Sequence, residues 1–497
     1  MRPLRLLALA ALASSQALLK PQPSSFNSTF TLTAAQIAAA NLSAAVANNV
    51  NVAAQFERSN WATGSVRDDP FYTSLPANAS SAAAGAVLKV EAWTDTSRYT
   101  VPPTLALSRI VYQSLTLNGT RVPVSAYVLW PYLPRRHRGG AGGRKTAPLV
   151  SWGHGTSGLF AECAPSHIRN LWYQFSAPYA LALAGYAVVG TDYAGMGVPF
   201  FPDGGNITHQ YIASPAAGND LLYAAQAAQA AFPDRLSKEF VVMGHSQGGG
   251  AAWAAAQQQL TARVPGYLGT VAGSPVTNPI ELTVALGNSL GLLLTAKSFL
   301  SVFGELSLSD MLTPAGVAAV NLLDEIQGCN SVFNTLLGDL LAADPRLALT
   351  RDEFVSSPYA RLFGNLTLAG DRDFAGPMLV LQGTADQNVP EPLTTEYVNK
   401  TCAAFPHHEL RYVRASAVSH TPVMYATQQI WMDWLDERFG AGVGGGHGRR
   451  RDGEGFGRHT GRCIVQEIGS DAPQPLGHYQ GGLNYFLEYS LDDYQVA

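Results

Sequence analysis

Residues 239–254, EFVVMGHSQGGGAAWA, leave the backbone few ways to fold. An apolar, β-branched stretch ends at Gly244 and an alanine-rich helical pattern follows Gly248, so a strand, a sharp turn and a helix are predicted, with Ser246 at the turn. Glycine is needed on both sides, because a Cβ at Gly244 or Gly248 would collide with the other limb of the turn. With His245 before the serine, this pattern of a nucleophile elbow predicts a serine nucleophile.

Strand and helix patterns alternate on both sides of this elbow. Apolar runs predict strands at 148–152, 186–191, 239–244, 268–272, 378–382 and 409–413. Helices are predicted between and after them, at 170–184, 214–232 and 422–439, so a mostly parallel sheet with helices on both faces is expected. Strand patterns at 87–93, 108–117 and 122–130, with a hairpin turn at Asn118-Gly119, predict an antiparallel start. Together with the elbow, this predicts the α/β-hydrolase fold.

The alternation stops between residues 276 and 370. Helical patterns at 282–302, 314–326 and 332–341 follow one another there without a clear strand. An insertion at this point lies over the carboxyl ends of the strands, where ligands bind, so a helical cap or lid is predicted. The same apolar surfaces also fit a fixed part of the core, and the pattern does not separate the two.

A serine hydroxyl is a poor nucleophile until a base takes its proton, and a third group must orient that base. Asp386 follows the strand pattern at 378–382, and His420 follows the strand pattern at 409–413. Both are thereby placed on loops at the carboxyl edge of the sheet, the edge that carries Ser246. The chain order serine, acid, histidine also fits this fold, so these three residues are the predicted catalytic triad.

Other residues could fill these roles by type alone. Ser289 is the centre of a second G-x-S-x-G, but it lies inside the helical insertion and bulky leucines follow it, so a plain insertion serine is predicted. His407 and His408 precede the last strand pattern and therefore lie on the wrong edge of the sheet. His447 and His459 lie in a glycine- and arginine-rich linker.

The tetrahedral intermediate of acyl transfer needs two backbone N–H donors for its oxyanion. Gln247, the first residue of the predicted helix, supplies one of them. The loop GHGTSG at 153–158 supplies the other; Thr156 is favoured, Gly155 is the alternative, and His154 is expected to be structural.

Asp192 follows the strand at 186–191 on the same edge of the sheet. It is expected to support the oxyanion loop by hydrogen bonds, and a direct role stays open. No cluster of His, Cys, Asp and Glu has the spacing of a metal site, and there is no phosphate-binding glycine loop, so neither a metal nor a cofactor is predicted.

Three features indicate a secreted, extracellular glycoprotein. Arg2 and Arg5, the apolar run at 6–12 and a small-x-small cleavage site at 15–17 form a signal-peptide pattern, with an uncleaved anchor as the alternative. Four cysteines, far apart and even in number, predict two disulfides with three connectivities open: Cys163, Cys329, Cys402 and Cys463. Seven N-x-S/T sequons are candidate glycosylation sites: Asn27, Asn41, Asn78, Asn118, Asn206, Asn365 and Asn399.

The chain has 497 residues, of which 47% are apolar and only 14% charged, with a formal net charge of −4. This composition allows a large core and argues against a disordered or nucleic-acid-binding protein. No later apolar run is long enough to cross a bilayer. The predicted parts are a signal peptide (1–17), an N-terminal arm (18–68), a first core part (69–275), the insertion (276–370), a second core part (371–440) and a linker with a tail (441–497). The basic loop at 135–146 is expected at the surface, and the tail is expected to be held only through Cys463.

Seven short stretches between residues 69 and 440 follow one another in a fixed order: DPFY at 69–72, SWGHGTS at 151–157, CAPS at 163–166, TDYAGMG at 191–197, GHSQG at 244–248, GTAD at 383–386 and VSH at 418–420. In this combination they resemble the secreted lipase-like family of the α/β-hydrolases, fungal secretory lipases and their bacterial relatives. The resemblance implies ester substrates, often of fatty acids, and a lid built from the insertion. It also implies disulfides from Cys163 to Cys329 and from Cys402 to Cys463. The basic loop and the tail depart from the family pattern, and the resemblance does not fix the acyl chain length.

These observations predict a secreted serine carboxylic ester hydrolase, lipase-like, that cleaves acyl esters through an acyl-enzyme on Ser246. The predicted partners are small-molecule or lipid esters and, transiently, a lipid–water interface. A serine peptidase of the same fold is the first alternative; it would need an acidic cluster for a substrate amino group, and Asp324 with Glu325 is the one tempting pair. A non-catalytic binding protein of the same fold is the second alternative, although such proteins typically lack a triad member.

Overall fold

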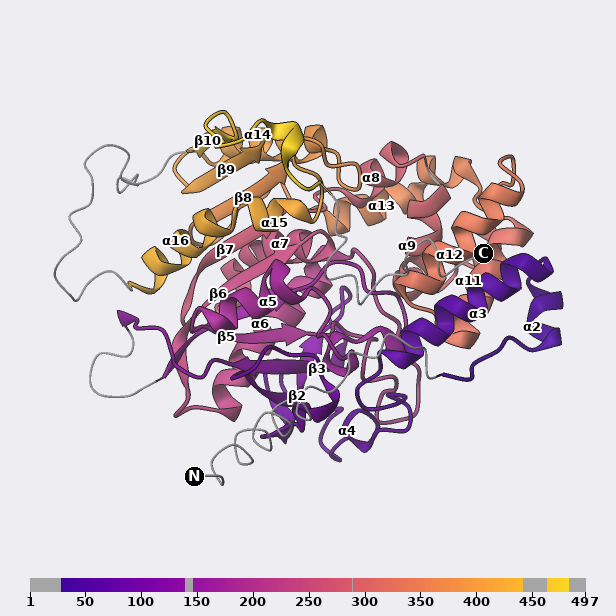
Figure 1. Cartoon of the computed structure of the whole chain (residues 1–497), viewed down its shortest axis with the longest axis horizontal. Coiled ribbons are helices and arrows are strands. Elements are labelled where there is room, and N and C mark those ends of the chain that lie inside the picture. The colour runs from indigo at the N-terminus through magenta and orange to yellow at the C-terminus, as the bar shows by residue number, and fades with distance from the viewer. Residues whose placement is uncertain (1–27, 139–145, 288, 441–462, 482–497) are drawn as a thin grey trace, which may run out of the picture.

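The structure is a computed structural model that describes residues 28–138, 146–287, 289–440 and 463–481 (Figure 1). The predicted signal peptide, most of the basic loop, the linker and the end of the tail lie outside these residues, and so do Asn27, His447 and His459.

A ten-stranded sheet runs through the described chain in the order β1-β2-β3-β5-β4-β6-β7-β8-β9-β10. The pairs from β1 to β5 are antiparallel, and all neighbours from β5 to β10 run parallel. The mostly parallel sheet with an antiparallel start confirms the predicted fold class. The strands are β1 (Val87–Glu91), β2 (Ala106–Leu115), β3 (Arg121–Trp130), β4 (Ala147–Gly153), β5 (Ala187–Thr191), β6 (Leu236–His245), β7 (Tyr267–Gly273), β8 (Met378–Gly383), β9 (Leu410–Ala415) and β10 (Cys463–Ile468).

Helices cover both faces of the sheet because its central strands are apolar on both sides. In β6, Val241 lies in the core layer that contains Trp431, whereas Val242 lies in the layer that contains Leu221. Successive strand residues face opposite sides, so the two layers have to be covered by different helices. These core helices are α4 (Pro70–Thr73), α5 (Pro178–Leu183), α6 (Ser214–Ala231), α7 (Gln247–Ala262), α14 (Glu391–Ala404), α15 (Pro422–Ala426) and α16 (Gln428–Phe439).

The insertion between β7 and β8 consists of helices and their connections. They are α8 (Pro279–Ala285), α9 (Ser289–Val302), α10 (Leu308–Met311), α11 (Pro314–Ile326), α12 (Asn330–Ala343) and α13 (Pro358–Thr367). The single helix predicted at 282–302 is wrong; it is divided between α8 and α9, because Gly287 turns the chain with a φ of 81°.

The N-terminal arm lies against this insertion at one end of the molecule, where α2 (Ala34–Ala39) and α3 (Ala44–Ser59) run beside α11 and α12 (Figure 1). Asn49 of α3 donates to Asp339 at 2.9 Å. The Glu57 carboxylate accepts the backbone amides of Cys329 at 2.8 Å and Val332 at 2.9 Å. Glu57 therefore caps the N-terminus of α12, although burial raises the pKa of its carboxyl to about 7.

The helix predicted over residues 170–184 is wrong in its first half. α5 begins only at Pro178. Before it, Leu171, Trp172 and Gln174 have φ values of 54°, 58° and 41°, which a right-handed helix does not allow. The segment turns instead so that Trp172 Nε1 donates to the Gly155 carbonyl at 3.1 Å. Local helix propensity is overridden here by contacts with the loop after β4.

The tail is attached by more than its cysteine. Cys463 begins β10, which pairs in parallel with all of β9 and forms the edge of the sheet. The prediction that only Cys463 holds the tail is therefore wrong. This short strand, CIVQEI, was not predicted because it follows directly on the glycine-rich linker sequence. Its backbone hydrogen bonds to β9 extend the sheet.

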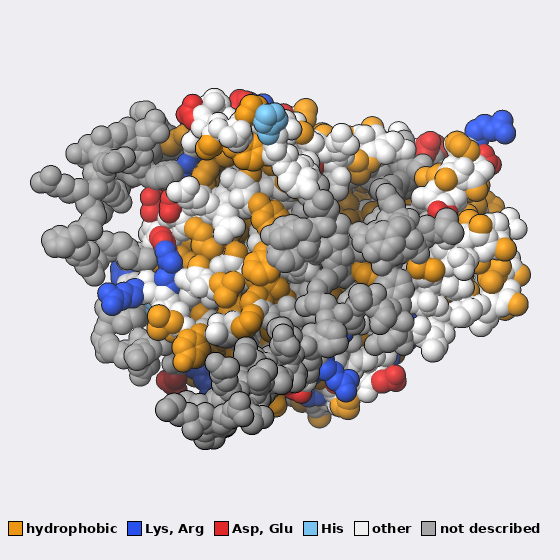
Figure 2. All heavy atoms as spheres, viewed as in Figure 1, with side chains coloured by type: hydrophobic (Ala, Val, Ile, Leu, Met, Phe, Trp, Pro, Cys, Tyr) orange, Lys and Arg blue, Asp and Glu red, His pale blue; other side chains and the backbone are white. Residues whose placement is uncertain are grey.

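Figure 2 shows one face of the molecule, on which acidic and basic side chains are scattered without a large patch of either sign. This distribution agrees with the small net charge of −4. None of the helices in the described part of the chain combines the length and the apolar character needed to span a bilayer.

Candidate active site

Ser246 stands at a strained turn between β6 and α7. Its φ of 61° and ψ of −120° lie in a backbone region that residues other than glycine rarely adopt. A Cβ on Gly244 would lie 2.0 Å from the Gly248 carbonyl oxygen, and a Cβ on Gly248 would lie 2.0 Å from the Gly153 carbonyl oxygen. The glycines are thus required because the two limbs of the turn and the end of β4 touch one another. This is the geometry of a nucleophile elbow.

Asp386 and His420 meet at the same edge of the sheet, on the loops after β8 and β9. His420 Nδ1 lies 2.7 Å from Asp386 Oδ2. The other carboxylate oxygen, Oδ1, accepts the amides of Asn388 and Val389, each at 2.9 Å. Burial raises the pKa of Asp386, but the hydrogen bond and the charge of His420 and the Val389 amide outweigh it, so the pKa is lowered overall. Asp386 therefore stays a carboxylate that can orient the imidazole.

His245 connects the elbow to the loop of His420. Its Nε2 lies 3.2 Å from the His420 carbonyl, which can only accept, and its Nδ1 lies 2.5 Å from the Tyr173 hydroxyl. Burial, followed by the charge of His420, lowers the pKa of His245 well below its usual range, so this ring is neutral. The rings of His245 and His420 are 4.5 Å apart. Within the described residues no hydrogen bond joins Ser246 Oγ to His420 Nε2, a contact that often tightens only when substrate binds.

The loop after β4 passes directly beside the serine. A Cβ on Gly155 would lie 3.1 Å from Ser246 Cβ and 2.1 Å from the Tyr173 hydroxyl, so only glycine fits there. Gln247 is the first residue of α7. In the described part of the chain, neither its backbone amide nor that of Thr156 has a hydrogen-bond acceptor. Both amides are therefore available to an oxyanion.

The comparison with protein families agrees with this geometry. The sequence model of the family described as "alpha/beta hydrolase fold" matches residues 154–426, more than half of the chain. The chain belongs to the α/β-hydrolase fold family. The match spans Ser246, Asp386 and His420. Among curated proteins no sequence matches.

Solved structures of a lipase and of an esterase are among those similar in fold. Lipase A of Candida antarctica in its closed state has a TM-score of 0.59 at 15% identity, over 78% of this chain and 89% of that chain. The rice cell wall degrading esterase LipA of Xanthomonas oryzae has a TM-score of 0.55 at 18% identity, over 72% of this chain and 98% of that chain. At such identities the likeness establishes the fold alone.

Within this α/β-hydrolase, the Asp192 backbone lies beside the ring of His154 in the oxyanion loop, whereas the Asp192 carboxylate bonds to residues outside that loop. The carboxylate accepts the Ser125 hydroxyl at 2.6 Å, the Ser166 hydroxyl at 2.5 Å and the Ser166 amide at 2.8 Å. The side chain of Asp192 thus ties β3 to the turn at 165–167. Burial raises its pKa to about 7 despite these hydrogen bonds. His154 is buried as well, and burial lowers its pKa to about 3, so it is neutral.

The competing residues lie on other elements and have other partners. Ser289 begins α9 a few residues after α8 ends, so the second G-x-S-x-G joins two helices and has no strand before it. His408 Nε2 lies 3.2 Å from Asp373. In α11, Asp324 is ion-paired with Lys297, and Glu325 accepts from Gln36 at 2.9 Å.

Two disulfides join distant parts of the chain. Cys163 is bonded to Cys329 in front of α12, and Cys402 of α14 is bonded to Cys463 of β10. These are the pairs that the resemblance implies. No group of three or more His, Cys, Asp and Glu side chains in the described residues could hold a metal ion.

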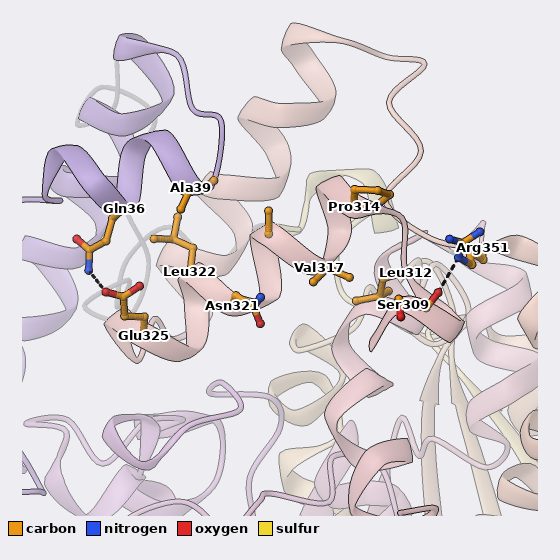
Figure 3. A pocket seen from close by; sticks show the side chains of 12 residues that line it. Gln36, Ala39, Ser309, Leu312, Pro314, Val317, Asn321, Leu322, Glu325 and Arg351 are labelled. Carbon is orange, nitrogen blue, oxygen red and sulfur yellow. Dashed lines mark hydrogen bonds between the residues drawn. The ribbon is translucent and has the colours of Figure 1, made fainter. Parts of the chain in front are cut away.

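Several cavities of the described chain border the insertion. Figure 3 shows one of about 430 Å³, between α2 and the helices α10 and α11, and another of about 580 Å³ lies between the N-terminal arm and the end of α11; no triad or oxyanion residue lines either of them. A much smaller one, about 10 Å³, is lined by Thr156, by Asn330 and by apolar side chains from the loop and from α9 and α12: Leu159, Phe160, Leu294 and Phe333. The insertion therefore places apolar groups beside the oxyanion loop.

Four side chains at the site could not be predicted from the sequence. Tyr173 reaches His245 from a segment that was predicted as helix, and Trp172 reaches Gly155 from the same segment. His209 and Tyr211 contact the side chains of the two predicted oxyanion donors from a connection without a recognisable pattern. Only the fold brings these residues to the elbow.

Proposed function

We propose that this α/β-hydrolase is a secreted serine carboxylic ester hydrolase of the lipase type. One observation carries the proposal: the hydrogen-bonded pair of His420 and Asp386, 2.7 Å apart, lies at the sheet edge where strained Ser246 projects from its elbow. A nucleophile, a base and an orienting carboxylate in this order are what acyl transfer to serine requires.

In the proposed mechanism, Ser246 Oγ attacks the ester carbonyl carbon while His420 Nε2 takes the hydroxyl proton. Asp386 holds the ring by Nδ1 and stabilises the imidazolium. The amides of Gln247 and Thr156 stabilise the tetrahedral oxyanion. The oxyanion then collapses, His420 returns the proton to the departing alkoxide, and an alcohol leaves. Water, deprotonated by His420, attacks the acyl-enzyme in the same way and releases the carboxylic acid.

The apolar side chains near Thr156 support an acyl substrate. Leu159 and Phe160 of the loop and Leu294 and Phe333 of the insertion lie around a space next to Thr156 that, at about 10 Å³, has room for about one water molecule. Apolar side chains at the carbonyl-binding loop favour a hydrocarbon acyl group over a charged one. The two similar structures belong to a lipase and an esterase, and both names agree with this class.

Secretion is proposed from the sequence, with support from two features of the structure. Two disulfides are typical of an oxidising compartment. The six sequon asparagines among the described residues are all exposed: Asn41, Asn78, Asn118, Asn206, Asn365 and Asn399. Glycan attachment requires such exposure.

A series of p-nitrophenyl esters from acetate to palmitate tests the proposal, with protein secreted from a eukaryotic host. We expect hydrolysis by the wild type and its loss in Ser246→Ala. Rates that rise toward long chains would assign a lipase, and rates confined to acetate and butyrate would assign a short-chain esterase.

Absence of Ser246-dependent hydrolysis of every ester would contradict the proposal. Aminoacyl amides assayed in parallel then separate the two alternatives: their cleavage would indicate a peptidase, and inactivity toward both classes would indicate a binding protein.

A further inference from the structure

The side chains of both proposed oxyanion donors are hydrogen-bonded to one short segment in front of α6. We propose that residues 209–211, the 209–211 brace, position the oxyanion hole, with His209 and Tyr211 as positioning residues. This inference rests on the proposed function and adds to it two residues that touch no substrate.

His209 fixes the side chain of Gln247. His209 Nδ1 lies 2.9 Å from the Ala194 carbonyl, which can only accept, so Nδ1 carries the proton. The unprotonated Nε2 then accepts the Gln247 side-chain amide at 2.9 Å. Within the described residues Gln247 Oε1 has no partner, so His209 is the hydrogen-bonding anchor of this buried amide. Burial lowers the pKa of His209 to about 4, which keeps the acceptor available at neutral pH.

Tyr211 fixes the other donor. Its hydroxyl lies 2.7 Å from Thr156 Oγ1. Thr156 sits on a loop with no regular backbone ladder of its own, so this contact orients the residue whose amide must face the oxyanion. One segment thus reaches both sides of the oxyanion hole.

The 209–211 brace is itself held in a constrained conformation. Ile212, a β-branched residue, has a φ of 50°, which persists only where the surrounding structure enforces it. A Cβ on Gly195 would lie 2.2 Å from the backbone nitrogen of His209, so the loop after β5 packs tightly on the brace. Gln210 accepts the Leu117 amide at 2.7 Å. A rigid brace is what positioning to a fraction of an ångström requires.

The brace is also bound to the insertion. Ser298 of α9 donates to the Tyr211 carbonyl at 3.1 Å, and Gln210 donates to Ser301 of α9 at 3.2 Å. α9 additionally supplies Leu294 beside Thr156. The helix that places Leu294 beside Thr156 therefore also contacts the segment that orients the oxyanion donors.

The test uses Tyr211→Phe and His209→Leu, with His209→Gln as the conservative variant because it retains an acceptor for Gln247. We expect Tyr211→Phe to lower kcat about tenfold and His209→Leu about a hundredfold, each with KM within about twofold of the wild type, and His209→Gln to recover most of the loss. Affinity for an alkyl boronic acid, which forms a tetrahedral adduct on the serine, should fall by the same factor as kcat/KM.

Tyr267→Phe is the matched control, because the partly buried Tyr267 makes a contact of the same length, 2.7 Å, with the Thr270 hydroxyl, besides a hydrogen bond to the Ala375 carbonyl at 3.2 Å. It should leave kcat and boronate affinity unchanged. Two results would refute the positioning role of the brace and leave the proposed function intact. One is a kcat/KM of the brace variants within about twofold of the wild type, and the other is a lowered kcat with unchanged boronate affinity. Tyr211→Phe retains its ring, so it decides the question even if His209→Leu does not fold. A wild type without Ser246-dependent hydrolysis would instead overturn the proposed function and the brace with it.

Discussion

The loop after β4 lies so close to Ser246 that a methyl group added at Gly155 has no free space. In Gly155→Ala, the new Cβ would lie 2.1 Å from the Tyr173 hydroxyl and 3.1 Å from Ser246 Cβ. Either the loop or the tyrosine has to move, and Thr156 moves with the loop. We expect kcat for an active p-nitrophenyl ester to fall at least about a hundredfold, as for the loss of one oxyanion donor.

Gly338→Ala is the control for this prediction, since a Cβ at that position of α12 meets open space. It should leave kcat unchanged. Gly155→Ala that keeps half of the wild-type kcat would show that the loop does not lie against the serine in the active protein.

The buried carboxyl of Asp192 should make the free energy of unfolding depend on pH. Burial raises its pKa to about 7, from an ordinary value of 3.8. The folded state therefore holds a proton that the unfolded chain has already lost, and the contribution of Asp192 to stability is complete below about pH 4 and is lost as pH rises through about 7. Asp192→Asn removes this titration. Its free energy of unfolding, relative to the wild type, should rise between pH 4 and pH 8 by up to about 4 kcal/mol.

Urea unfolding of both proteins across this pH range measures the difference. A difference that stays constant with pH would mean that Asp192 is ionised in the folded protein throughout, and that its three hydrogen bonds from Ser125 and Ser166 outweigh burial.

The proposed triad could be placed from the sequence because its chemistry dictates residue types, chain order and position after a strand. The elbow glycines could be predicted because sterics demand them. His209, Tyr211 and Tyr173 could not be predicted, because each reaches the site through a contact with a residue far away in the sequence. The local sequence around a histidine or tyrosine in a loop does not indicate which distant residue the fold will bring into contact with it.

At the scale of elements, the N-terminus of α12 depends on a carboxylate from another helix. In Glu57→Ala, the amides of Cys329 and Val332 lose their acceptor in a buried place. We expect the free energy of unfolding to fall by about 2 kcal/mol and hydrogen exchange in α12 to accelerate. Glu396→Ala, which removes an exposed pair with Lys400, should cost no more than about 0.5 kcal/mol. Equal effects of the two substitutions would show that Glu57 does not cap α12.

Most helices and strands could be predicted from the periodicity of apolar residues. The segments that differ from the prediction owe their conformation to tertiary contacts. Residues 170–177 read as helix, but Trp172 and Tyr173 pack on the site in left-handed or turned backbone. β10 was hidden because a strand of six residues gains its stability from pairing with β9, which local sequence does not display.

For the molecule as a whole, the disulfide from Cys402 to Cys463 attaches the C-terminal strand to α14 across a separation of 61 residues. Replacing both cysteines by alanine should lower the free energy of unfolding by about 4 kcal/mol, because the unfolded chain regains the entropy of that loop. Activity at 25 °C should persist, since neither cysteine contacts the triad. Thermal unfolding and the ester assay measure the two effects; loss of activity in a variant that still folds would show that this disulfide also supports the loop of His420, where Ser419 donates to the Gly481 carbonyl of the tail at 3.2 Å.

The central claim is that Ser246, and not Ser289, is the nucleophile of this molecule. Labelling the secreted protein with a fluorophosphonate and locating the adduct by peptide mass spectrometry tests it most directly. One adduct on the peptide that contains Ser246, with loss of ester hydrolysis in proportion to labelling and no labelling of Ser246→Ala, is the predicted result. An adduct on Ser289, or an unlabelled wild type, would contradict the proposed site.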